Sequence, residues 1–155
     1  MLRIVCLICA SVTIISLCTI PDAEAQQVKI SGFTDISLGT WNGSGNLSGE
    51  NSLCVYNEAT PDYRVRARGS GAGNSFMLNG SDSDLAYQVR FKESSGSYVS
   101  LTADTFQNFT GADTDDIACG GSNNANLEVI VTSDALSAAA SGSYSGTLTV
   151  LLETL

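Results

Sequence analysis

The sequence contains no histidine and few basic residues. Seven of its 155 residues are Lys or Arg, whereas 16 are Asp or Glu, and the formal net charge at pH 7 is −9. Without an imidazole base, the usual serine and cysteine catalytic triads cannot be assembled. Phosphate backbones require a basic surface, and this chain lacks one overall, so we expect no nucleic acid partner.

Long apolar runs are also scarce, since one lies at the N-terminus and no second one follows. Residues 4–20 are uncharged, Arg3 precedes them, and Ala23-Glu24-Ala25 supplies the small-x-small pattern of a signal peptidase site. We predict that residues 1–25 are a signal peptide and that cleavage between Ala25 and Gln26 releases the mature protein. A proline and two acidic residues end the run close to the minimum spanning length, so we expect no membrane-spanning segment after cleavage.

Removal of the signal peptide leaves few cysteines. Three of the five lie in residues 1–25, so the mature chain retains Cys54 and Cys119. Two cysteines in an exported chain usually form a disulfide, because the compartment is oxidising. We predict this bond, which would close a loop of about 65 residues and stabilise the fold by about 4 kcal/mol on the chain-entropy model. A zinc site is disfavoured, since two thiols without histidine fall short of four ligands.

The predicted mature chain has the size of one domain. Residues 26–155 carry six basic and fourteen acidic residues, which gives a net charge of −8. About 130 residues are enough to bury a single core, and we find neither an internal repeat nor a linker. We therefore treat residues 26–155 as one domain.

Period-two alternation of apolar and polar residues dominates this domain. It is clearest in residues 63–68, 85–92, 127–131 and 144–153, and clusters of Gly, Ser, Asn and Asp separate the alternating segments at residues 42–51, 69–74, 79–84, 94–97 and 120–124. This pattern predicts an all-β fold, an antiparallel sandwich or barrel of about seven to nine strands. One short helix is predicted over residues 134–140, with Ser133 as its cap and Gly142 at its end.

Two loops invite functional interpretations that simpler ones outweigh. Residues 69–74 are rich in glycine, but no Lys-Ser/Thr follows them as a phosphate-binding loop requires, so we interpret them as a strand connection. Clustered carboxylates are suitable ligands for Ca²⁺, although the acidic runs here lack the spacing of a calcium loop. A solvated acidic loop is the favoured interpretation, and calcium binding stays open. These carboxylates are Asp82, Asp84, Asp113, Asp115 and Asp116.

Five of the six cations of the mature chain lie on the polar sides of two predicted strands. They are Arg64, Arg66 and Arg68 on one strand and Arg90 and Lys92 on the other. If both strands share a sheet face, these residues form one positive patch suited to an anionic polysaccharide or lipid headgroup. The alternative is that they pair with acidic residues on neighbouring strands.

An ordered set of segments along the mature chain resembles the spore coat protein U / archaic chaperone-usher pilin-like family. The similarity covers nearly the whole mature chain and rests on the order of the segments rather than on one diagnostic motif. The segments are ISGFTDISLGTWNG (30–43), LCVYN (53–57), DYRV (62–65), LAYQV (85–89), Cys119 followed by NANLEV (124–129), and SGSYSGTLTV (141–150).

This resemblance implies an immunoglobulin-like β-sandwich that lacks its final strand. It implies a periplasmic or cell-surface protein of a Gram-negative bacterium, and a missing strand supplied first by a chaperone and then by the next subunit. The open edge would lie beside the last apolar strand, at Leu148, Val150 and Leu152. Only residues 26–31 precede Gly32 in the predicted mature chain, so Val28 to Ile30 is either a donor segment or the first strand of the domain.

We predict from these observations an exported, noncatalytic pilin-like subunit of a fimbrium with a role in cell adhesion. Its expected partners are a periplasmic chaperone, an outer-membrane usher and other pilin subunits, and no cofactor or metal is expected. The alternative is a stand-alone periplasmic or surface binding domain for carbohydrate or another anionic ligand. A small enzyme ranks third, because no combination of a nucleophile with a base, and no metal site, can be assembled from these residues.

Overall fold

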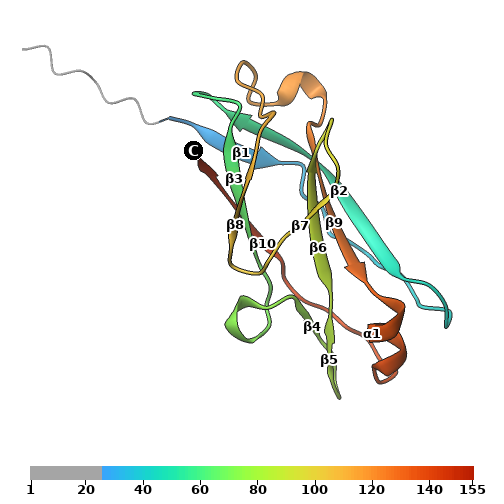
Figure 1. Ribbon diagram of the computed structural model, residues 1–155. Helices are drawn as coiled ribbons and strands as arrows, with labels where there is room; N and C mark the ends of the chain where they lie inside the picture. The colour runs from blue at the N-terminus through green and yellow to red at the C-terminus, as the bar shows by residue number, and fades with distance from the viewer. Residues whose placement is uncertain (1–25) are drawn as a thin grey trace, which may run out of the picture.

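The computed structural model describes residues 26–155, so the predicted signal peptide and Ala25 lie outside the described residues (Figure 1). Ten β-strands, one α-helix and two short 3₁₀ helices follow one another along this part of the chain. They are β1 (Val28–Ser31), β2 (Leu47–Asn57), β3 (Tyr63–Arg68), η1 (Ala72–Asn74), β4 (Met77–Asn79), β5 (Asp84–Ala86), β6 (Gln88–Glu93), β7 (Val99–Ser100), β8 (Phe106–Phe109), η2 (Cys119–Gly121), β9 (Ala125–Val131), α1 (Ser133–Ala138) and β10 (Thr149–Thr154).

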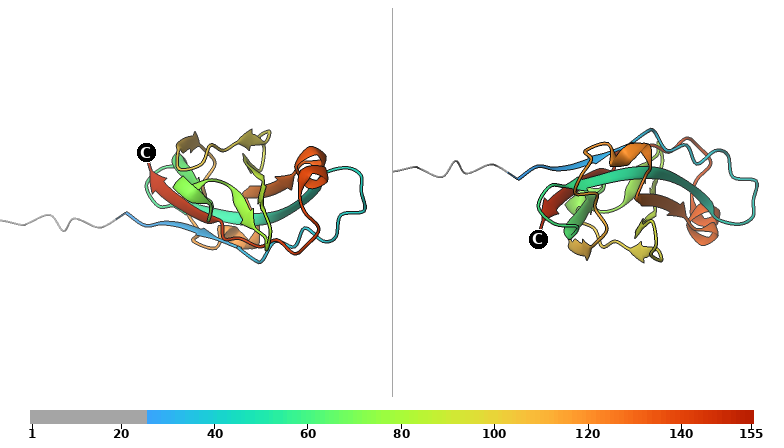
Figure 2. Two further views of the ribbon diagram at one scale, coloured as in Figure 1. Left: turned by 90° about the horizontal axis from the view of Figure 1, so that it is seen from below. Right: turned by 90° about the horizontal axis from the view of Figure 1, so that it is seen from above.

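The strands form an antiparallel β-sandwich, which confirms the predicted fold class. One sheet has the order β1-β2-β9-β6-β7 and the other has the order β10-β3-β8, while β4 and β5 form a separate pair. Every pairing between named strands is antiparallel. The two sheets face each other across the core in both views of Figure 2. The ten strands exceed the expected number because β4, β5 and β7 have only two or three residues each.

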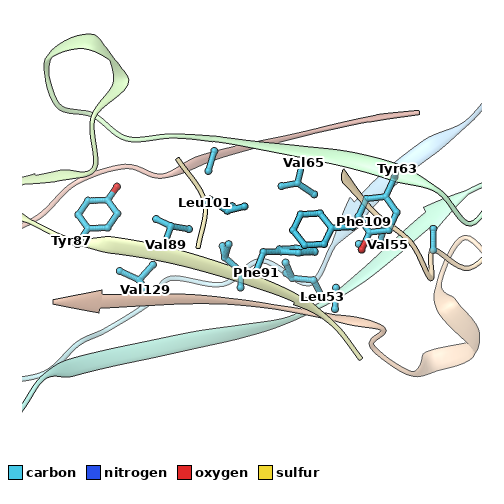
Figure 3. Packing of buried hydrophobic residues seen from close by; sticks show 14 of the residues in the cluster. Leu53, Val55, Tyr63, Val65, Tyr87, Val89, Phe91, Leu101, Phe109 and Val129 are labelled. Atoms are coloured by element: carbon cyan, nitrogen blue, oxygen red, sulfur yellow. The ribbon is translucent and has the colours of Figure 1, made fainter. Parts of the chain in front are cut away.

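The alternating residues identified in the sequence supply the core. Their apolar side chains point between the sheets, and Figure 3 shows them meeting there. At one end of the core, the rings of Phe91 and Phe109 lie 4.7 Å apart, and Tyr63 stacks on Phe109 at 6.0 Å. Burial of such side chains typically contributes about 1.5–3 kcal/mol each. The remaining buried strand residues include Leu53, Val55, Val65, Ala67, Val89, Leu127 and Val131.

Two predicted strands are shorter in the structure than in the sequence pattern. Residues 85–92 alternate as one strand, but the chain changes partners at Tyr87, whose backbone N–H bonds to Phe76 O at 3.0 Å, so β5 pairs with β4 and β6 pairs with β9. Residues 144–153 also alternate throughout, yet β10 begins only at Thr149. Alternation reports which side of the chain is buried, whereas strand assignment also requires a continuous backbone partner.

The predicted boundaries of one turn and one helix are also wrong. The turn predicted at residues 42–51 ends earlier, because Leu47 already pairs with Val131 at the start of β2. The helix begins at Ser133 rather than at residue 134. Its cap is Thr132, whose side chain accepts a hydrogen bond from the backbone N–H of Ala135. Among residues 26–155 there is no helix with the length and apolar character required to traverse a bilayer.

The predicted disulfide is present. Cys54 on β2 and Cys119 on η2 are bonded, with their Cα atoms 5.8 Å apart, and both residues are buried. The bond ties the loop before β9 to β2. The same loop is held by Asn124, whose side chain accepts a hydrogen bond from Val55 N and donates one to Val55 O, both at 2.8 Å.

We expect replacement of both cysteines, Cys54→Ala together with Cys119→Ala, to destabilise the domain by about 4 kcal/mol. The physical reason is the larger conformational freedom of the unfolded chain once a loop with a sequence separation of 65 residues is no longer closed. Urea unfolding of the exported protein and of the double variant measures this difference. Equal midpoints, or two thiols that react with an alkylating agent before reduction, would contradict the prediction.

Candidate functional site: an open apolar groove

The three-stranded sheet has an uncovered edge at β10. Within residues 26–155, β10 pairs with β3 on one side and with no strand on the other. The side chains of Leu148, Val150 and Leu152 point toward the core but stay only partly buried, whereas Val65 and Ala67 on the adjacent strand are fully buried. The structure therefore places all three residues that the sequence assigned to an open edge at an edge that lacks a cover.

The N-terminal part of the chain forms the opposite side of this opening. β1 pairs with β2 from Val28↔Asn57 to Ser31↔Cys54, so these residues are a strand of the domain itself. β1 and β10 lie side by side without pairing, as the blue and dark red strands in Figures 1 and 2 show. After β1, the chain diverges from β2 at Gly32. The φ angle of Gly32 is 96°, and a Cβ added to this residue would lie 2.8 Å from Ser52 O. Glycine is required there on both grounds.

Residues 33–41, which we call the strap, continue beside the opening. None of them belongs to a strand, and none forms a backbone–backbone hydrogen bond with another described residue. Side chains hold the strap instead. Thr34 Oγ1 donates to Asn51 Oδ1 at 2.6 Å, and Asn51 Nδ2 donates to Thr34 O at 2.8 Å. Ile36 packs so closely over Gly49 that a Cβ at residue 49 would lie 2.6 Å from Ile36 Cγ2.

Between the strap and the chain leading into β10 lies an apolar groove with two compartments. The first has a volume of about 400 Å³, and its floor includes Tyr87, Leu127 and Val129. The second has a volume of about 630 Å³ and lies between the end of the strap, near Trp41, and the segment from α1 to Tyr144. Leu38 and Leu78 line both compartments, so the two are continuous.

The two walls of this groove run in opposite directions and offer unpaired backbone groups. The strap runs from the first compartment to the second, whereas the C-terminal chain runs from the second compartment to the first. Among the residues of the C-terminal wall, Ser145 forms backbone hydrogen bonds with Asn79 on the side of β4. An extended segment in the groove would have the backbone of the strap on one side and the backbone of the C-terminal chain on the other.

The predicted positive patch is not formed, because the two strands that carry it belong to different sheets. Arg64, Arg66 and Arg68 lie on the outer side of β3, and Arg90 and Lys92 lie on the outer side of β6. These are opposite faces of the sandwich. The prediction of one patch fails because alternation shows which residues point outward but not which sheet a strand joins.

Each arginine cluster is paired with acidic and aromatic neighbours. Arg64 bonds Glu153 at 2.7 Å, and Arg66 and Arg68 both pair with Asp104. The guanidinium carbons of Arg64 and Arg66 lie 4.3 and 4.4 Å from the centroid of the Phe106 ring, within the range of a cation–π interaction. These contacts give the cluster on β3 a structural role.

The cluster on β6 is held in the same way. Arg90 bonds Glu128 at 2.6 Å, and both Arg90 and Lys92 lie over the ring of Tyr98, whose hydroxyl donates to Glu50 at 2.7 Å. Burial and the hydrogen bond to Glu50 raise the pKa of Tyr98. The phenol therefore remains neutral and connects the loop before β7 to β2.

The acidic residues lie in two separate loops. Asp82 and Asp84 belong to the turn and strand of the β4–β5 pair, whereas Asp113, Asp115 and Asp116 precede η2. Asp113 Oδ1 accepts hydrogen bonds from the backbone N–H groups of Asp116 and Asp115, which lower the pKa of Asp113. In the described part of the chain, no three His, Cys, Asp or Glu side chains are grouped so as to hold a metal ion.

Comparison with solved structures shows that this fold is similar to that of two chains from fimbrial proteins. The chain resembles a chain of the chaperone–tip adhesin complex of CFA/I fimbriae biogenesis, with a TM-score of 0.57, 14% identity and 83% of this chain covered. It also resembles CfaE, the adhesive subunit of the CFA/I fimbria of enterotoxigenic Escherichia coli, with a TM-score of 0.54, 14% identity and 83% of this chain covered.

The likeness is one of fold. The matched part makes up 42% and 43% of those two chains, so this chain spans less than half their length. Neither the comparison with family models nor that with curated proteins gives a match. The pilin-like β-sandwich is thus established at the level of the fold.

The sequence interpretation missed the strap and the polar groups of the groove floor. Strap residues 33–41 alternate only weakly, and glycines flank them, so they were not recognised as a wall. Asn51 lies on the inward side of β2 between Gly49 and Leu53 and is 6% exposed. A polar residue on the apolar side of a strand was the available signal, because such residues are buried only with a partner.

We expect the triple variant Arg64→Ser, Arg66→Ser, Arg68→Ser to unfold at a lower temperature than the wild type. The loss of three ion pairs and of the Phe106 contacts should lower the midpoint by roughly 5 °C, since each exposed pair contributes little alone. Lys29→Ser is the control, because Lys29 makes no salt bridge with a described residue. Unchanged stability together with lost adsorption to anionic beads at low salt would instead assign the cluster to binding.

We expect the contribution of Asp104 to stability to depend on pH. The hydrogen bond from Arg68 is the main cause that lowers the pKa of Asp104. A carboxyl with a lowered folded-state pKa stabilises the fold above its unfolded value of about 4, and this stabilisation is lost as pH falls through the folded value. The difference in thermal midpoint between the wild type and Asp104→Asn should therefore be present at pH 7 and should shrink progressively as the pH falls below about 4.

Proposed function

We propose that this protein is an exported pilin-like subunit of a cell-surface fibre and that its groove accepts a β-strand from another polypeptide. One observation carries the proposal. A largely apolar groove separates the chain that leads into β10 from the strap, whose backbone forms no backbone–backbone hydrogen bond within residues 26–155. A strand with alternating apolar and polar residues would pair with the unpaired backbone of both walls. Its apolar side chains would at the same time fill the floor of the groove.

The size of the groove sets the length of the strand. At about 3.3 Å per residue, the nine residues of the strap span roughly 30 Å, so an occupant of about nine residues would fill the groove. Its inward side chains would cover Leu148 on one wall and Ile36 and Leu38 on the other, all of which are partly buried. An uncovered groove of this kind is costly in water, and it exposes a sheet edge to unspecific pairing.

The likeness to fimbrial adhesin structures supports the same function. One of the matched chains belongs to a chaperone–tip adhesin complex, and the other is the adhesive subunit of a fimbria. We infer by analogy that the partners are a periplasmic chaperone, an usher and other pilin subunits. The segments that resemble the spore coat protein U family, together with the predicted signal peptide, support export to the periplasm or cell surface and a noncatalytic role.

The experiment is to add a synthetic strand to the isolated domain. Purified residues 26–155, with the disulfide intact, should self-associate or unfold at a low temperature. A nine-residue peptide with Val at alternating positions and Thr or Lys between them should convert the domain to a monomer with a higher unfolding midpoint. Light scattering after size exclusion and thermal unfolding measure both effects.

Two controls make this test specific to the groove. A scrambled peptide of the same composition should have no effect, because it cannot direct all its apolar side chains to one face. Leu148→Asp should weaken the response to the alternating peptide, since it places a charge on the wall of the groove. A domain that is monomeric, unfolds cooperatively at high temperature and does not respond to any peptide would refute the proposal.

A further inference from the structure

Two buried side chains with polar groups lie in the first compartment of the groove, whose lining also includes Thr34, Asp35 and Thr147. The compartment is lined by the side chains of Asn51 and Tyr87, each of which is only 6% exposed. Apolar side chains of Leu127, Val129 and Leu148 surround them. Because buried polar groups are normally retained only with hydrogen-bond partners, their presence in a groove floor calls for a specific reason.

The hydroxyl of Tyr87 forms no hydrogen bond with residues 26–155, and unlike the hydroxyl of Tyr63 it is open to solvent in the groove. Its ring packs against Phe76 at a centroid distance of 5.5 Å, and Figure 3 shows the hydroxyl pointing away from β6. Burial raises the pKa of Tyr87, so the group stays protonated and is able to donate one hydrogen bond and to accept others. A strand that fills the compartment would exclude water from this hydroxyl and would have to supply its partner.

The amide of Asn51 is only partly satisfied. It accepts one hydrogen bond from Thr34 Oγ1 and donates one to Thr34 O. A side-chain amide has two N–H donors and two acceptor lone pairs on oxygen. One donor and one acceptor therefore remain for a group in the compartment.

The register of the five-stranded sheet gives the spacing of these two groups. Asn51 lies opposite Leu127 in the pairing of β2 with β9. Tyr87 directly precedes Gln88, which lies opposite Ile130, so Tyr87 is next to Val131. Four residues of β9 separate the two positions, which corresponds to about 13 Å along the strand.

We infer that these two groups select the register of the bound strand by hydrogen bonding to its side chains. The occupant, an extended strand as in the proposed function on which this inference rests, carries a hydroxyl or amide side chain at the inward position that meets Tyr87. A second polar side chain four residues away meets Asn51. All other inward side chains are apolar.

The physical basis is that a polar side chain is accepted only where it finds a partner. A hydroxyl placed over Leu127 or Val129 would lose its hydrogen bonds to water and gain none, whereas beside Tyr87 it would satisfy two groups at once. A shift of the strand by two residues would keep its apolar side facing inward but would leave both hydroxyls unpaired. A single buried Asn fixes the register of coiled coils for the same reason.

The test is a threonine scan of the alternating peptide. Each inward Val is replaced in turn by Thr, which has nearly the same shape, and the Kd of each peptide is measured by calorimetry. With the wild-type domain, Thr should be tolerated to within about twofold at the position that meets Tyr87 and at the position four residues away. At the other inward positions it should weaken binding by about tenfold or more.

The variant Tyr87→Phe removes only the hydroxyl and should abolish the tolerance at the first of these positions. Tyr63→Phe is the matched control, because Tyr63 is also buried with an unpartnered hydroxyl but does not line the groove. The scan with this control should match that of the wild type. Thermal unfolding of each variant with the all-Val peptide shows that it is folded and binds.

Two outcomes would overturn the inference. Either Thr weakens binding equally at every inward position of the wild type, or Tyr87→Phe leaves the preferred position unchanged. Failure of the all-Val peptide to bind the wild type is a different result, because it would reject the groove as a strand acceptor and the inference together with it.

Discussion

The need of backbone groups for hydrogen-bond partners governs this structure. Most strands of the sandwich satisfy it by pairing, and their apolar sides close over a core that includes Phe91 and Leu127. At the edge of β10 the pairing stops, and the strap runs beside the opening without joining a sheet. The groove begins where this pairing stops, and the unpaired backbone of its walls is a consequence.

The two ends of the sandwich differ in how firmly they are closed. Near the C-terminus, the stacked rings of Tyr63 and Phe109 and the disulfide from Cys54 to Cys119 hold the sheets and the loop before β9 together. Toward α1, the groove widens into its larger compartment. A domain built in this way keeps a defined fold at one end while the other end stays open along the groove, which is the arrangement that strand acceptance requires.

The paired charged residues complement this division, because they stabilise the outer faces of the sandwich. Arg64 and Arg66 enclose Phe106 on one face, while Arg90 and Lys92 cover Tyr98 on the other. Their acidic partners lie on neighbouring strands or loops, such as Glu128 on β9 and Asp104 before β8. The five cations that the sequence places at regular spacing therefore do not form one positive patch.

The sequence by itself determined the all-β class, the inward residues of β3, β6 and β9, and the disulfide, since these depend on local alternation and on the cysteines that remain after export. The sequence also led to the prediction that Leu148, Val150 and Leu152 lie at an open edge of the sandwich. Only the tertiary structure decided which sheet each strand joins, and so it separated Arg64 from Arg90 and brought the strap beside the chain that leads into β10. The pairing of distant strands also brings Tyr87 and Asn51 into the same groove. Such pairing is not encoded in the alternation of residues within any single strand.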